Sequence, residues 1–411
     1  MVRLAFVDLI FSWPPNGGAD IDCHHVISGL QRAGHDVHLF VAHERESTER
    51  GRVDPADLPF PATRLDFTRR TLRADRVARA FQEAVDAWRP DIVFLMHGFA
   101  LKPHVALALA HHRTVSRYYA HELACARDAL RFKDGAPCPN DYLRTPDLCR
   151  RCALDHQRQA IRQWRFRTWT ADYLAARAYA PAYHAQVLAA LRTMDAVMVY
   201  HGALRTHLEG LHDNVLVIPG GVSVTAVAAQ AAPEKGPGDE KIIFMSGRAD
   251  DPLKGLDTLL EAGRILWERR QDFVILATHF DATLRRPYFR SVPWRDHAGA
   301  LALYAQADIC AAPSIWAEPF GLTAVEAMAA GRPVCASRIG GLQDIVRHGE
   351  TGFLLSPGDA PEWAKALEIL LDNPALRREM GAAGRRVAET EYDWDRVIAR
   401  HYLPLLERLG S

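Results

Sequence analysis

The sequence lacks several features that would place it in a class at once. No uninterrupted apolar stretch reaches the length that a membrane-spanning helix needs. Lysine plus arginine and aspartate plus glutamate number 50 each, so the net charge gives no argument for a nucleic-acid partner. The chain also has no G-x-G-x-x-G motif, so a dinucleotide-dependent redox enzyme is unsupported. It has no internal repeat of fixed short period and no low-complexity region.

Signal-peptide features and cysteines are also scarce. Residues 1–13 are apolar but short, contain Asp8 and lack a small-residue cleavage site. They therefore predict a first strand rather than a signal peptide, and we expect a cytoplasmic protein. The 7 cysteines of this large chain are then expected to be thiols or metal ligands rather than disulfides.

What is present is the alternation of short apolar runs with helical patterns. The 411 residues, 48% hydrophobic and 24% charged, suit two domains of ordinary soluble composition. Strands are expected at 3–11, 36–42, 91–96, 114–119, 196–200, 215–218, 241–245, 273–277, 309–312 and 333–336. Strands separated by helices predict parallel sheets, and the Ala/Pro/Gly-rich stretch 224–241 is the candidate linker. Ligands in such sheets bind at the carboxyl ends of the strands, so we expect both domains to contribute to one cleft.

The most informative segment is residues 307–334. An apolar strand leads through Pro313 and Glu318 to Gly321, where a helix carrying Glu326 is expected to begin. Free N–H groups and the positive end of the helix dipole bind anions at such a position. Carboxylates beside it are suited to sugar hydroxyls, because each accepts two hydrogen bonds from a diol. A ligand that is both phosphorylated and polyhydroxylated, such as a nucleotide sugar, fits this segment.

Several motifs in order resemble one family over nearly the whole chain. Glu318 and Glu326 form an E-x7-E signature, supported by Gly17-Gly18 after the first strand and by Ser246-Gly247-Arg248 with Lys254-Gly255. The segments 218–222 and 348–354 add to it. The chain resembles the retaining glycosyltransferases of the GT-B fold in family 4, the glycosyl transferases group 1. That resemblance implies two Rossmann-like, doubly wound parallel-sheet domains facing each other across a cleft.

The resemblance also implies roles for individual residues. Glu318 would bind the donor sugar, Glu326 the ribose, and Arg248 and Lys254 the diphosphate in place of a catalytic metal. His121 would contact the donor sugar from the first domain, and His97 would line the acceptor side. The remaining donor-binding candidates are Gly17, Gly18, Gly247, Phe320, Gly321, Leu322 and Thr323.

The implied enzyme is a metal-independent retaining transferase that acts by front-face attack, with UDP-sugar as the default donor. Residues 1–223 with 392–411 would form the acceptor-side domain, and 240–391 the nucleotide-sugar domain. The acceptor is open between a polysaccharide, a lipid-linked glycan and a small metabolite. Three alternatives are also open: a GT-B epimerase, a phosphorolytic enzyme and a catalytically silent sugar-nucleotide-binding subunit.

A cysteine-bearing insertion is expected at 123–155. Cys125, Cys138, Cys149 and Cys152 follow His121 and end in a C-x2-C pair, which is typical of zinc knuckles. Structural zinc, free thiols and disulfides are the three open states. A catalytic zinc is disfavoured, because four cysteine ligands leave no open position.

The segment 158–169 interleaves cations with aromatic residues. Packing of a long helix against the insertion is one interpretation. The other is a surface that docks a membrane-linked or anionic acceptor, which would make the protein peripheral to the inner face of the membrane. Neither the charge nor the motifs predict an oligomeric state.

Overall fold

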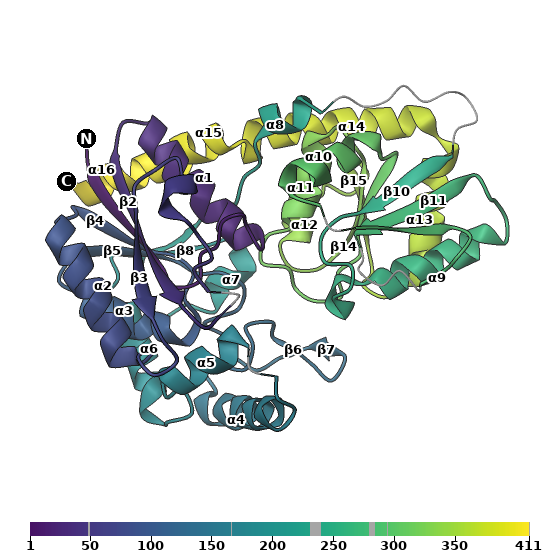
Figure 1. Ribbon diagram of the computed structural model, residues 1–411. Coiled ribbons are helices and arrows are strands. Elements are labelled where there is room, and N and C mark those ends of the chain that lie inside the picture. Colours follow the sequence, from purple (N-terminus) through teal and green to yellow (C-terminus); the bar gives the residue numbers. More distant parts are fainter. Residues whose placement is uncertain (48–49, 166, 231–239, 279–283, 294, 411) are drawn as a thin grey trace. The chain divides into compact units, whose positions relative to one another are not determined.

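The structure is a computed structural model that describes residues 1–47, 50–165, 167–230, 240–278, 284–293 and 295–410. The chain divides into two compact units. Unit 1 comprises Met1–Pro219 and Val397–Ser411, and unit 2 comprises Gly220–Arg396. Each unit contains its own parallel sheet flanked by helices, as Figure 1 shows. The predicted α/β class with two parallel-sheet domains is confirmed.

Unit 1 is built on a sheet in the order β3-β2-β1-β4-β5-β8-β9, in which every pair is parallel. Its strands are β1 Arg3–Asp8, β2 Asp36–Glu44, β3 Ala62–Phe67, β4 Ile92–Leu95, β5 Arg113–Arg117, β8 Ala196–Val199 and β9 Val215–Val217. Its helices are α1 Gly18–Arg32, α2 Ala74–Trp88, α3 Lys102–Ala108, α4 Pro146–Arg162, α5 Thr168–Ala175, α6 Ala182–Thr193 and α7 Gly202–Thr206. Strands β4 and β8 are apolar throughout, as expected where helices cover both faces of a sheet, whereas β5 between them has the sequence Arg-Thr-Val-Ser-Arg.

Unit 2 repeats this plan in the order β12-β11-β10-β13-β14-β15. Its strands are β10 Lys241–Met245, β11 Phe273–Thr278, β12 Phe289–Val292, β13 Ile309–Ala312, β14 Val334–Ser337 and β15 Gly352–Leu355. Its helices include α8 Val224–Ala228, α9 Leu256–Trp267, α10 His297–Gln306, α11 Leu322–Ala329, α12 Leu342–Ile345, α13 Ala360–Asp372 and α14 Pro374–Val387. Counted within the unit this order is 3-2-1-4-5-6, the dinucleotide-fold arrangement, with its switch point between β10 and β13.

The observed limits differ from the predicted ones in a few places. The strand predicted at 114–119 ends at Arg117, so His121 lies in a turn beyond it. The predicted linker 224–241 does not separate the units. Its first part is α8, which begins at the cap Ser223 and packs on α10 and α11 inside unit 2. Residues 231–239 of that stretch lie outside the described residues.

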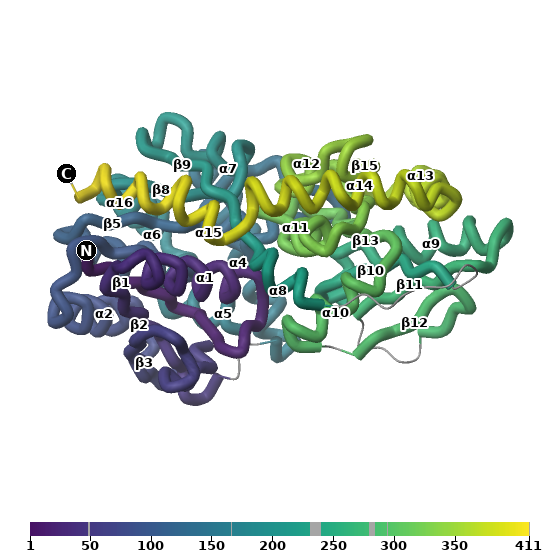
Figure 2. The backbone as a smooth tube through the Cα atoms, turned by 90° about the horizontal axis from the view of Figure 1, so that it is seen from above, coloured from purple at the N-terminus to yellow at the C-terminus, as the bar shows by residue number. Residues whose placement is uncertain are grey.

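The domain limits predicted at 223 and 392 also differ from the units. Val222 pairs with Asp393, Gly221 packs on Trp394, and all four belong to unit 2. The chain then returns to unit 1 through α15 Trp394–Val397, a π-helical segment Ile398–Tyr402 and α16 Leu403–Gly410. There Ile398 lies against Gly29 of α1. Figure 2 shows the yellow C-terminal segment running next to α1. No described helix has both the length and the apolarity to cross a bilayer.

Candidate active site

The loops that follow β10 and β13 meet at the switch point of unit 2. The two strands are parallel neighbours, with Ile243 opposite Ile309. The backbone N–H of Ile315 donates to Leu253 O at 2.9 Å and joins the two loops. Gly255, at φ +80°, lies so close to Pro313 that an added Cβ would come within 1.9 Å of its carbonyl oxygen. Glycine is therefore required here, and the predicted Lys254-Gly255 pair is explained by close loop packing.

Glu318 and Lys254 are in direct contact, as the two halves of one charged cluster. Lys254 Nζ donates to Glu318 Oε1 at 2.7 Å, and Ser314 Oγ lies 2.6 Å from the same oxygen. The side chains of Lys254 and Glu318 are 22% and 13% exposed. Lys254 also faces the Trp316 ring at 5.6 Å. The pair is shielded enough to be ordered and open enough for a ligand to exchange with it.

The loop between Glu318 and α11 is held by two glycines that the sequence motifs did not include. Gly341 N–H donates to Glu318 O at 2.7 Å. An added Cβ at Gly341 would lie 2.2 Å from Phe320 O, and one at Gly340 would lie 2.4 Å from Glu318 O. The backbone of the E-x7-E loop thus rests directly on the turn after β14. A Gly-Gly pair after a buried strand was the signal that could have revealed it.

Helix α11 begins at Gly321, which adopts φ +116° and provides no side-chain cap. The first turn of such a helix presents backbone N–H groups and the positive end of the dipole. Gly247, after β10, lies next to Thr323, because an added Cβ would be 3.9 Å from Thr323 Cγ2. The structure therefore brings Gly247, Gly321, Leu322 and Thr323 to the same place.

Glu326 is buried, with a 5% exposed side chain, and its Oε1 lies 2.7 Å from Nε2 of His297. His297 is the first residue of α10, whose cap is Asp296. The hydrogen bond to Glu326 raises the pKa of His297 above its ordinary value. His297 was missed by sequence reasoning, because no spacing connects it to residues 29 positions away.

Arg248, unlike Lys254, the other predicted diphosphate ligand, is largely exposed. Its guanidinium is 62% exposed and lies 3.9 Å from Asp251 Oδ2. A surface ion pair of this length contributes little stability, so the side chain is held loosely. Phe320 is buried in unit 2, against Gly220 and the ring of Tyr392. The structure thus gives Phe320 a packing contact in addition to its predicted backbone role.

In unit 1 the loop after β1 is organised by two buried carboxylates. Asp8 accepts from the N–H groups of Ile10 and Phe11, and Asp20 accepts from those of Ser12 and Asn16. Burial raises the pKa of Asp8 to about 6 and, together with Asp8, that of Asp20 to about 7.

The predicted glycines stand at the start of α1. Gly17 is its N-cap residue, in an extended conformation, with open space where a Cβ would stand. Position 17 therefore has no local steric requirement for glycine. Gly18, the first residue of the helix, is exposed.

His97 and His121 follow the parallel neighbours β4 and β5. The ring of His97 lies 4.8 Å from Phe99 and 5.1 Å from Tyr119, and burial lowers its pKa to about 3, so the imidazole is neutral. His121 is 5% exposed. Its N–H donates to Ala129 O at 3.0 Å and its carbonyl accepts from Cys125 N–H at 2.8 Å, so the cysteine-bearing segment positions it.

The four predicted cysteine ligands are all free thiols of intermediate exposure. Within the described residues, a compact group of three candidate metal ligands occurs elsewhere. Asp86 Oδ1 lies 2.8 Å from His111 Nε2 and 2.6 Å from His112 Nε2, on the outside of unit 1. These two hydrogen bonds already account for the cluster.

Comparison with known proteins places unit 2 in a family. Residues 240–373 match the family Glycosyl transferases group 1. The chain carries a group 1 glycosyltransferase domain. That match contains Arg248, Lys254, Glu318 and Glu326, so the paired carboxylate and lysine lie within the glycosyltransferase domain.

The chain also has relatives among curated proteins. The chain is 34% identical over 217 residues to phosphatidyl-myo-inositol mannosyltransferase of Mycobacterium leprae, covering 51% of this chain and 58% of that protein. It is 32% identical over 217 residues to D-inositol 3-phosphate glycosyltransferase of Pseudarthrobacter chlorophenolicus, covering 48% and 51%. The chain thus spans just over half the length of these relatives.

Solved structures match across both units. Sucrose-phosphate synthase from Thermosynechococcus elongatus aligns with TM-score 0.70 and 20% identity over 100% of both chains. Anabaena HepE in complex with UDP and glucose aligns with TM-score 0.65 and 17% identity, again over 100% of both. These likenesses establish the GT-B fold for the chain that carries the group 1 glycosyltransferase domain.

Proposed function

We propose that this protein is a retaining glycosyltransferase that moves a sugar from a nucleotide-sugar donor to an acceptor hydroxyl. The observation that carries the proposal is the Lys254–Glu318 pair beside the Gly321 helix start, at the switch point of unit 2. A lysine, a carboxylate and a helix N-terminus at one point match the three parts of the donor: diphosphate, sugar hydroxyls and the β-phosphate oxygens.

In the proposed reaction the bond between the sugar C1 and the β-phosphate oxygen breaks. The acceptor oxygen bonds C1 on the same face, and its proton passes to the leaving phosphate. Lys254 and the N-terminus of α11 stabilise the charge that develops on that phosphate. Glu318 already binds Lys254 and Ser314 through Oε1, and we assign the sugar hydroxyls to its Oε2.

Glu326 is proposed to accept the ribose hydroxyls and Arg248 to contact the diphosphate. Because Arg248 is exposed and its ion pair with Asp251 is long, it is proposed to contact the diphosphate only once the donor is bound. His121, His97, Gly17 and Gly18 enter through the family resemblance, with His121 at the donor sugar and His97 on the acceptor side.

The donor nucleotide is proposed to be UDP, which the solved structure of Anabaena HepE binds. The names of two relatives indicate acceptors that contain an inositol phosphate group, and one of them indicates mannosyl transfer. An inositol phosphate is therefore the first acceptor to assay, ahead of polysaccharides, other lipid-linked glycans and small metabolites.

Peripheral membrane contact is the second part of the proposal. Trp164 is 93% exposed, and Arg162, Arg165 and Arg167 around it are exposed as well. Phe166 of the same segment lies outside the described residues. Trp169, by contrast, packs on Phe99 at 4.3 Å. A tryptophan among arginines suits an anionic interface, so Trp164→Ala should reduce co-sedimentation with anionic vesicles.

The test of the function is a screen of UDP-, GDP- and ADP-sugars. A ligand at 100 times its Kd raises the stability of the folded state by about 2.7 kcal/mol, which a thermal shift detects. Product analysis then decides the class. A glycosylated acceptor with unchanged anomeric configuration supports the proposal. The alternatives give other results. An epimerised sugar nucleotide would indicate an epimerase, a sugar phosphate formed from added phosphate would indicate a phosphorolytic enzyme, and binding without turnover would indicate a silent binding subunit.

A further inference from the structure

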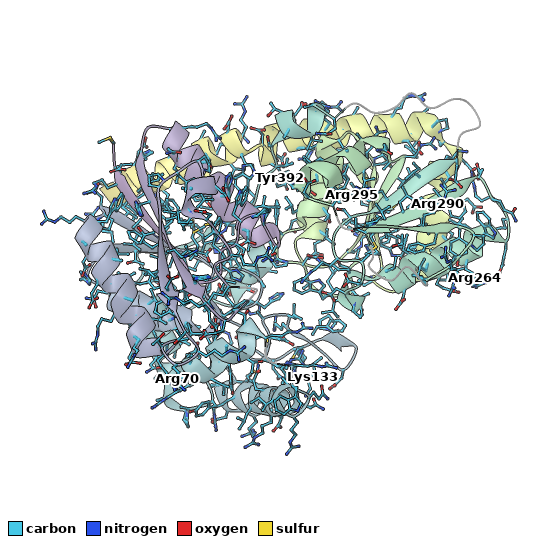
Figure 3. All side chains as sticks on the ribbon, in the orientation of Figure 1. Arg70, Lys133, Arg264, Arg290, Arg295 and Tyr392 are labelled. Carbon is cyan, nitrogen blue, oxygen red and sulfur yellow. The ribbon has the colours of Figure 1, made fainter. Side chains whose placement is uncertain are left out.

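The segment that follows His121 has a buried base, which includes Leu123, Ala124 and Tyr142, and an exposed hairpin. It contains a two-stranded hairpin, β6 Phe132–Lys133 and β7 Ala136–Pro137, whose residues 133–137 are all exposed. Lys133, labelled in Figure 3, marks this hairpin. A two-stranded ribbon of this kind is marginally stable in water unless something else fixes it.

The backbone of this segment also contains three residues in the left-handed region that are not glycine. Ala129, Arg131 and Asp134 have φ of +59°, +54° and +52°. Such residues carry a conformational cost of about 1–3 kcal/mol each and persist only where surrounding structure over-determines them. Ala129 is buried, and the Arg131 side chain donates to Asn140 O and Pro139 O. Asp134 lies in the exposed hairpin, where apolar packing supplies no restraint.

The four cysteines of the segment line one cavity. Cys125, Cys138, Cys149 and Cys152 all border a space of about 60 Å³, together with Arg127, Arg131 and Lys133. They come from three separate pieces of backbone: the turn after His121, the residue after β7, and helix α4. Cys149 and Cys152 stand three residues apart on α4, the spacing that puts two side chains on one face of a helix.

The geometry points to a structural zinc ion held by these four thiolates. Four sulfur ligands with no open position are the donor set of structural zinc sites, and the C-x2-C pair on a helix is their common spacing. The ion would tie the exposed hairpin, the turn after His121 and α4 together. Arg127, Arg131 and Lys133 would offset the negative charge of the four thiolates around one divalent ion.

The site has to tighten to bind the ion. The cysteine sulfurs do not form a group of three within 4.8 Å of one another, whereas zinc–sulfur bonds of about 2.3 Å require closer spacing. Rotation between staggered χ1 wells moves a cysteine sulfur by about 3 Å, which is the scale of the adjustment. The present partners of two of the sulfurs, Asp128 for Cys125 and Asn140 for Cys138, are weak contacts at 3.5 and 3.7 Å.

The experiment is to purify the full chain without a histidine tag and measure its zinc content and its zinc K-edge absorption. We expect one zinc ion per chain with a shell of sulfur at about 2.3 Å. Cys152→Ser should lose the zinc, whereas Cys152→His should keep it with a mixed sulfur and nitrogen shell. Zinc binding by the histidine variant would show that position 152 supplies a metal ligand, because a thiol that only packs would not be replaced by a zinc-binding imidazole. It would also show that loss of zinc in the serine variant comes from the missing ligand and not from misfolding.

Two control variants separate this site from other cysteines and from the surface histidines. Cys310→Ala removes a buried thiol of unit 2, and His112→Ala breaks the Asp86 cluster; both should retain the zinc. Three results would each overturn the proposal. The first is bound zinc whose shell contains only nitrogen and oxygen. The second is a folded, zinc-free chain in which a thiol reagent modifies all four cysteines, and the third is a protein mass lower by the two hydrogens lost when a disulfide forms.

Discussion

The two units share a topology but use the loop after their first strand in opposite ways. In unit 2 the loops at β10 and β13 present Lys254 and Glu318 as a partly exposed pair that a ligand can exchange with. In unit 1 the loop after β1 uses Asp8 and Asp20 to satisfy its own backbone N–H groups, and both carboxylates are buried. The same fold position can therefore serve recognition or loop closure, depending on whether its charges remain accessible.

The variant with the largest expected effect tests whether the partly exposed Lys254–Glu318 pair of unit 2 takes part in the reaction. Lys254→Ala should lower kcat by about 10²–10³-fold, the cost of removing one preorganised electrostatic group from a transition state. The measurement is steady-state turnover with the nucleotide sugar found in the screen.

Lys241→Ala is the matched control for that variant. Lys241 begins the same strand, β10, and forms an ion pair with Asp272 at the opposite end, with 26% exposure against 22% for Lys254. Its loss should leave turnover unchanged. Equal losses of turnover in both variants would show that Lys254 has no specific role in the reaction.

The second prediction compares glycines in the two units. Gly341→Ala should destabilise the protein by about 1–3 kcal/mol, because the added Cβ overlaps Phe320 O at 2.2 Å. Gly17→Ala, at the first loop of unit 1, meets open space and should cost only about 0.5–1 kcal/mol, the preference of an N-cap for glycine over alanine. Denaturant unfolding of both variants measures the difference. Similar costs would mean that unit 1 also depends on close backbone approach.

The third prediction concerns the buried carboxylates of unit 1. Burial raises the pKa of Asp20 to about 7, so the folded state binds a proton that the unfolded state releases above about pH 4. The free energy of unfolding should then fall as pH rises from about 4 to 7, by on the order of 3–4 kcal/mol. Asp20→Asn should flatten that part of the pH profile. An unchanged profile would show that Asp20 is ionised in the folded protein.

The smallest effect concerns His297 and Glu326 in unit 2. The raised pKa of His297 means that its ion pair with Glu326 is fully present below the unfolded-state pKa and is lost as pH rises through the folded value. Because the imidazole is about one-third exposed, we expect about 0.5–1 kcal/mol. The stability difference between wild type and His297→Gln should shrink above the folded pKa. A constant difference would contradict the ion pair.

Much of this organisation could be predicted from the sequence because it depends on local pattern. The strands at 241–245 and 309–312 were predicted with their observed limits, since buried parallel strands are short continuous apolar runs. The strands at 62–67, 289–292 and 352–355 were missed. All three lie at an edge of their sheet. The strands at 62–67 and 289–292 also carry mixed polar residues, which weakens the apolar signal.

The candidate site was predicted only in part. Glu318, Lys254, Gly247 and Gly321 were identified in advance, and the structure brings them together within unit 2. Ser314, His297 and Gly341 were not, because each acts through a contact with a residue on another loop. Whether His121 joins them stays a prediction, as do the metal-independent mechanism of the transfer and the UDP donor.

The sequence by itself determined the two-domain α/β class and the position of the E-x7-E segment, because periodicity and glycine placement are local properties of the chain. Only the tertiary structure decided which charges remain available. Lys254 and Glu318 lie 64 residues apart and became one pair because β10 and β13 are neighbours at the switch point. Asp8 and Asp20 became loop supports because the chain folds back over them and removes them from water. Burial and pairing of charges depend on distant contacts, so they follow from the fold and cannot be read from the order of residues.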